Sequence, residues 1–123
     1  MMRGVMVVVL LLAGTGRAWA VSDDCNTEDK MAKCCSLYEK SLHGSIYQFE
    51  HDLADQCANE IEGTRDQLNQ NQNFNACIPK ETSNEDLSRL FRGYVENHRD
   101  FWDRPARFGM IDDWSLHWPC KKY

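Results

Sequence analysis

The chain has 123 residues, of which 27% are charged and 42% are hydrophobic, and its formal net charge at pH 7 is −5. That length suffices for one domain. The Arg residues are scattered among Asp and Glu, with no basic stripe. An acidic chain of this kind has no electrostatic reason to bind nucleic acid or an anionic membrane, and we expect neither as a partner.

Residues 1–20 have the three parts of a secretory signal peptide. Arg3 supplies a positive start, residues 5–13 are apolar, and the A-W-A at 18–20 is a small-x-small cleavage site. The alternative is an uncleaved membrane anchor. It is disfavoured because the apolar run is shorter than the roughly 20 residues that cross a bilayer. We expect a secreted single domain of residues 21–123, whose 12 Lys and Arg against 19 Asp and Glu give a net charge of −7.

All cysteines lie after the predicted cleavage site. An even number of cysteines in a small secreted chain is typical of disulfides, although spacing alone does not choose their connectivity. Adjacent cysteines on a helix point about 100° apart, so Cys34 and Cys35 are expected to pair with different partners. No C-x-x-C and no paired Cys/His spacing indicates a zinc site. We predict three disulfides, formed by Cys25, Cys34, Cys35, Cys57, Cys77 and Cys120.

Apolar or thiol residues recur at steps of three or four through the first half of the mature chain, which is the pattern of one helical face. A single helix over residues 27–68 would be about 60 Å long, too long to stay covered in one small domain. We therefore predict helices at 27–42 and 46–69, separated at His43-Gly44-Ser45, with Asn26 as the first cap. The polar segment 67–75 is predicted to be a loop. The repeating residues are Met31, Cys35, Tyr38, Leu42, Ile46, Phe49, Leu53, Cys57 and Ile61.

A third helix is predicted to begin at a T-x-x-E capping box formed by Thr82 and Glu85. Its apolar repeat runs to Trp102, and Pro105 ends it because proline disfavours helical geometry in the preceding residue. Residues 106–123 are expected to form an irregular, aromatic tail with room for one more helical turn. The predicted fold is all-α: a small disulfide-stapled bundle of three main helices with that C-terminal tail.

No motif fixes a catalytic activity. Serines occur in no G-x-S-x-G setting, and the adjacent Asp112 and Asp113 are interpreted as solvated or capping carboxylates. Two pairs one helical turn apart, Glu39 with His43 and His51 with Asp55, lack the further ligands that a metal ion needs. We therefore assign no catalytic residue, no cofactor and no metal, and we expect that the protein is not an enzyme.

Four aromatic residues are the candidate binding residues: Tyr94, Trp102, Trp114 and Trp118. They are interpreted either as core or as part of a binding surface, since Trp and Tyr concentrate at interface hot spots. A disulfide from Cys120 is expected to fix Trp114 and Trp118 against the third helix, with at least one ring partly exposed. The expected function is binding of another extracellular protein, as a hormone-like, toxin-like or receptor-binding factor. The alternative is an extracellular carrier of a small apolar ligand.

Overall fold

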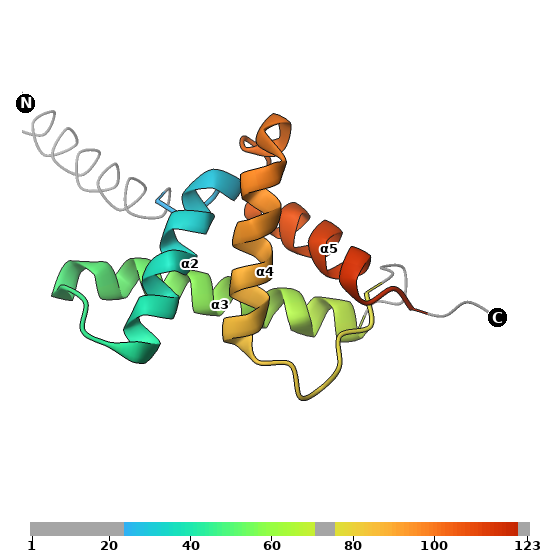
Figure 1. Cartoon of the computed structure of the whole chain (residues 1–123), viewed down its shortest axis with the longest axis horizontal. Coiled ribbons are helices and arrows are strands. Elements are labelled where there is room, and N and C mark those ends of the chain that lie inside the picture. Colours follow the sequence, from blue (N-terminus) through green and yellow to red (C-terminus); the bar gives the residue numbers. More distant parts are fainter. Residues whose placement is uncertain (1–23, 71–75, 121–123) are drawn as a thin grey trace, which may run out of the picture.

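The computed structural model describes residues 24–70 and 76–120, and this part of the chain is helical throughout its regular elements (Figure 1). The elements are α2 (Glu28–His43), α3 (Gln48–Gln70), α4 (Asn84–Asn97), the 3-10 helix η1 (Arg99–Phe101) and α5 (Ala106–His117). The predicted all-α, disulfide-stapled fold is confirmed. The predicted signal peptide, residues 1–20, lies outside the described residues.

The longest helix, α3, supports the other three. Figure 1 shows α3 passing behind both α2 and α4, with its N-terminal end projecting beyond α2 at the left of the view. Helix α4 lies between α2 and α5 and packs against both, and α2, α4 and α5 all contact α3. The core fills the space between these four helices. It contains Met31, Cys35, Cys57, Ile61, Leu68, Leu87, Phe91, Val95, Met110 and Trp114.

Three disulfides hold the bundle together. The adjacent cysteines pair with different partners, as predicted: Cys34 with Cys25 and Cys35 with Cys57. The Cys35–Cys57 bond joins α2 to α3 inside the core, where both residues are fully buried. The third bond joins Cys120 of the tail to Cys77. It ties the tail to the segment that precedes α4, where the Cys77 N–H also donates to the Trp118 carbonyl at 2.7 Å.

The first two predicted helices are confirmed, with corrections at their ends. The N-cap of α2 is Thr27, not Asn26, because the Asn26 carbonyl accepts a hydrogen bond from the Ala106 N–H at 3.1 Å. The chain leaves the helix after His43, at the predicted break. Helix α3 continues to Gln70, so the predicted loop begins later than residue 67. The rest of that loop, residues 71–75, lies outside the described part.

The third predicted helix, α4, is shorter than expected at both ends. Its N-cap is Ser83 rather than Thr82, and the Ser83 hydroxyl accepts from the Asp86 N–H at 3.0 Å. It ends at Asn97, not at Trp102. The Trp102 indole N–H donates to the Val95 carbonyl at 2.7 Å, so a side chain takes up one of the terminal carbonyls and the chain turns through η1.

The tail was expected to be irregular, but residues Ala106–His117 form the full helix α5. The prediction that Pro105 ends the third helix was wrong, because α4 already ends at Asn97; Pro105 instead occupies the N-cap of α5. Gly109 lies where α5 packs against α2 and α4: a Cβ there would be 2.7 Å from the Glu28 Cδ and 3.0 Å from the Phe91 ring. A glycine at this position is what allows α5 to pack so closely.

Candidate functional site

The four predicted binding aromatics do not form one exposed surface. Trp114 is fully buried and Tyr94 is only 8% exposed, so the core interpretation holds for both. Trp102 and Trp118 are half-buried and pack against the core from different places, one directly after η1 and one directly after α5. The structure therefore does not bring these four side chains together at one site.

Among the predicted binding residues, Trp102 lines a mainly apolar groove. This groove lies between α2 and α4 beside Ala32 and Val95, and its volume is about 340 Å³. Lys33 and Glu96 stand at its edge, and it is open to solvent. The groove is therefore a shallow surface feature rather than a closed cavity within the bundle.

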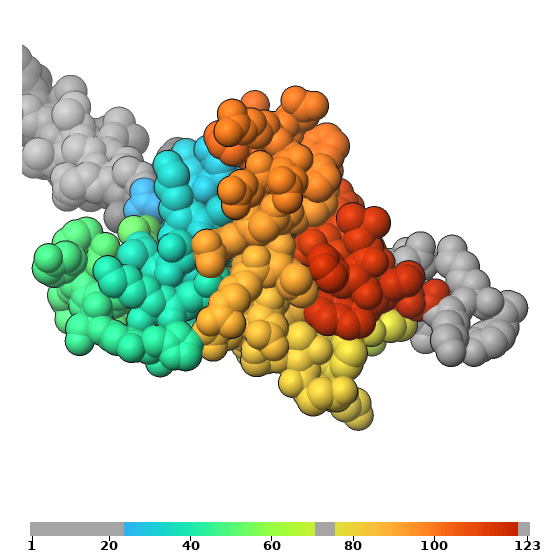
Figure 2. Space-filling model, in the orientation of Figure 1, coloured from blue at the N-terminus to red at the C-terminus, as the bar shows by residue number. Residues whose placement is uncertain are grey.

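Within residues 24–70 and 76–120, the most exposed aromatic side chains belong to residues that sequence analysis did not select as binding residues. Tyr47 and Phe49 are each 71% exposed, and their rings stack with centroids 5.8 Å apart and planes within 8°. We call Tyr47 and Phe49, which lie on the α3 side of the α2–α3 corner, the tip. The start of α3 is the green end at the left of the view in Figure 2.

The backbone of the tip is held in place by local contacts. The Tyr47 N–H donates to the Glu50 carboxylate at 3.0 Å, and the Glu50 N–H donates to the Tyr47 carbonyl at 2.9 Å. This reciprocal pair fixes the first turn of α3 in the manner of a capping box. The Cys35–Cys57 disulfide then joins the two helices that meet at the corner. The two exposed rings therefore stand on an ordered, covalently braced support.

An acidic surface begins next to the tip. Helix α3 contains six carboxylates against the single cation Arg65. Four exposed carboxylates recur along its outer side, opposite its buried residues, starting one turn after Phe49. We call them the acidic row: Asp52, Asp55, Glu62 and Asp66.

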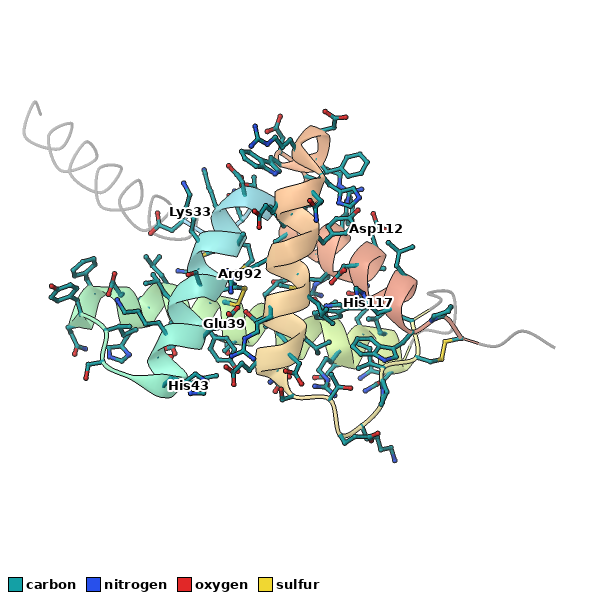
Figure 3. All side chains as sticks on the ribbon, viewed as in Figure 1. Lys33, Glu39, His43, Arg92, Asp112 and His117 are labelled. Atoms are coloured by element: carbon teal, nitrogen blue, oxygen red, sulfur yellow. A yellow bond between two sulfur atoms is a disulfide. The ribbon has the colours of Figure 1, made fainter. Side chains whose placement is uncertain are left out.

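A largely buried ion pair between Glu39 of α2 and Arg92 of α4 links these two helices. Glu39 is 8% exposed and its two carboxylate oxygens accept from the Arg92 Nε and Nη2 atoms at 2.7 and 2.5 Å. Ser88 donates to the same carboxylate at 2.6 Å. Figure 3 shows Glu39 and Arg92 facing one another between the two helices. The hydrogen bond to Glu39 raises the pKa of Arg92, so this arrangement is a stable ion pair and Glu39 is not available as a metal ligand.

A second polar cluster lies where α5 packs on α2 and α4. The fully buried Glu28 accepts from the Arg104 Nε at 2.7 Å, and Arg104 also donates to Asp112 at 2.9 Å. Burial raises the pKa of Glu28 against the opposing effect of Arg104. Asp113 is 3% exposed, and burial raises its pKa to about 6 although His117 lies 3.3 Å away. One oxygen of each carboxylate makes these contacts, whereas the other, Glu28 Oε1 or Asp113 Oδ2, is buried without a hydrogen-bond partner among the described residues.

The described residues contain no group of three or more His, Cys, Asp or Glu side chains placed to hold a metal ion. The His43 Nε2 atom lies 2.5 Å from the Glu85 Oε2 atom of α4.

In the described part of the chain, no helix has the length and apolar character needed to cross a membrane. No known protein family, curated protein or solved structure matches the chain.

The tip carried a weak signal in the sequence. Phe49 fits the apolar repeat and was therefore expected to be covered. The start of α3, however, extends past the end of α2, so a residue there meets no partner helix (Figure 1). Tyr47 lies outside the repeat, directly before the helix. Two aromatic residues placed just after a predicted helix break were the available indication of an exposed pair.

Proposed function

We propose that residues 21–123 are secreted and act by binding another extracellular protein rather than by catalysis. The observation that supports this function is the pair of stacked, 71% exposed rings of Tyr47 and Phe49. Exposed aromatics on a rigid support are typical of binding hot spots, because little conformational entropy is lost when they are covered. Three disulfides and a predicted signal peptide are consistent with an extracellular site of action.

The experiment is a binding screen of the secreted protein against a panel of extracellular receptor domains, followed by titration of each hit. We expect saturable binding in a one-to-one complex. Intact mass before and after alkylation, run on the same sample, is expected to show a chain that begins at Val21 and has no free thiol. The proposed function would be contradicted if the protein bound saturably to no member of the panel.

The groove beside Trp102 supports a second candidate, carriage of a small apolar ligand. Its volume of about 340 Å³ falls in the range of small-molecule sites, although it is more open than most of them. A fluorescent apolar probe distinguishes the two functions. Stoichiometric binding of the probe, lost in Trp102→Ala, together with no binding to the receptor panel would favour the carrier.

A further inference from the structure

The tip alone is too small to hold a stable complex. A large aromatic side chain offers on the order of 150–250 Å² for burial. At the observed exposure of 71%, Tyr47 and Phe49 together offer on the order of 300 Å². A stable interface needs about 800 Å² on each partner. A protein that binds through the tip must therefore contact further surface, and the charge of that surface decides the kind of partner.

One surface that adjoins the tip along α3 is the acidic row, which begins three residues after Phe49. From Asp52 to Asp66 it extends about 21 Å along α3 at 1.5 Å per residue. Among the described residues, none forms an ion pair with Asp52, Asp55 or Asp66. These charges are therefore not needed to hold the fold together, and they make this side of α3 negatively charged.

We propose that the protein docks on a partner protein that offers an apolar pocket for Tyr47 and Phe49 and, beside it, a basic ridge along the acidic row. This inference rests on the proposed function and names the chemistry of the partner. The stacked rings form one flat insert, and the row supplies the additional area and the orientation. Complementary charges accelerate association, whereas the buried rings slow dissociation.

Two other occupants fit the surface less well. In a dimer of two tips, each copy contributes the same small apolar area and the same negative charges, which repel one another. A membrane offers apolar depth for the rings, but anionic lipid headgroups repel the carboxylates next to them. A basic protein surface meets both requirements.

The first test concerns the rings, and it uses the secreted protein and the receptor domain that binds it. Tyr47→Ala/Phe49→Ala is compared with Leu116→Ala, whose side chain is also 71% exposed but belongs to α5. We expect the double variant to bind at least about 30-fold more weakly, mainly through faster dissociation, which corresponds to a hot spot of about 2 kcal/mol. Leu116→Ala should bind like the wild type, and all three proteins should melt alike.

The second test concerns the acidic row. Asp52→Asn/Asp55→Asn/Asp66→Asn removes three charges with little change in shape, and Asp103→Asn is the control on an exposed carboxylate outside α3. We expect the triple variant to associate about tenfold more slowly at low salt, with a weaker dependence on salt concentration. The control should leave both quantities unchanged.

The outcomes separate this inference from the proposed function. Receptor binding that is saturable but unaffected by both sets of changes would overturn the inference and leave the function standing. Self-association in sedimentation that is lost in Tyr47→Ala/Phe49→Ala would show that the tip binds a second copy. Binding to phosphatidylcholine or phosphatidylserine vesicles, lost in the same variant, would show a membrane site. Either result would overturn the proposed partner, and the absence of any receptor binding would overturn both proposals.

Discussion

Asp113→Asn should stabilise the protein at neutral pH and leave its stability unchanged in acid. Asp113 is 3% exposed, its Oδ2 atom has no hydrogen-bond partner, and burial raises its pKa from the ordinary 3.8 to about 6. Because the pKa is higher in the folded state, folding favours the protonated carboxyl. The associated stability is present below about pH 4 and is lost as pH rises through about 6. The pKa difference corresponds to on the order of 3 kcal/mol at neutral pH.

The assay is urea unfolding at pH 4 and at pH 7.5, monitored by circular dichroism, with Asp103→Asn as an exposed control. His117 and His98 both favour the ionised form of Asp113, so the observed gain should reach no more than the full 3 kcal/mol or so. The argument is refuted if Asp113→Asn lowers stability at pH 7.5, or if its effect is the same at both pH values. Either result would mean that the contact with His117 outweighs the cost of burying the charge.

Three further predictions concern packing and covalent structure. Trp114→Ala should destabilise the fold by about 3–5 kcal/mol in the same urea assay, because its side chain is fully buried; a loss below about 1 kcal/mol would contradict its place in the core. Gly109→Ala should cost about 1–3 kcal/mol through overpacking, whereas Gly93→Ala, with nothing within 4 Å of its added Cβ, should gain about 0.5–1 kcal/mol; equal effects would refute the close packing of α5. Limited reduction should open Cys77–Cys120 first, because Cys77 is exposed and the other two bonds are buried; mass spectrometry after alkylation would detect any other order.

Helical periodicity predicted α2, α3 and α4 because each buries one continuous apolar side. It did not predict α5, where Phe108 and Leu116 are exposed while Asp113 is buried, so apolar character does not mark the covered side. Capping positions were wrong by one residue at Asn26 and Thr82. At Asn26 the error has a tertiary cause, because its carbonyl accepts a hydrogen bond from the N–H of Ala106, 80 residues later in the chain.

The candidate site was less predictable than the fold. Sequence analysis favoured Trp and Tyr near the C-terminus, and two of those four residues are buried. Whether Phe49 is covered depends on how far α3 extends past α2, and that overhang is a property of packing that no local pattern encodes. The acidic residues of α3 were visible individually. Their position next to an exposed ring pair became apparent only when the start of the helix was placed.

We expect the contact between Glu28 and Arg104 to form later in folding than the contacts between α2 and α3. The Cys35–Cys57 bond joins α2 to α3 across a sequence separation of only 22 residues, and Cys25–Cys34 joins the start of the domain to α2 across 9. Glu28, in contrast, receives its counter-charge from a residue 76 positions later. Until Arg104 arrives, burying that carboxylate is unfavourable, and the first turn of α2 has to stay solvated. Native-state hydrogen exchange should therefore find the beginning of α2 and the beginning of α5 opening together as one cooperative unit, separate from the α2–α3 corner.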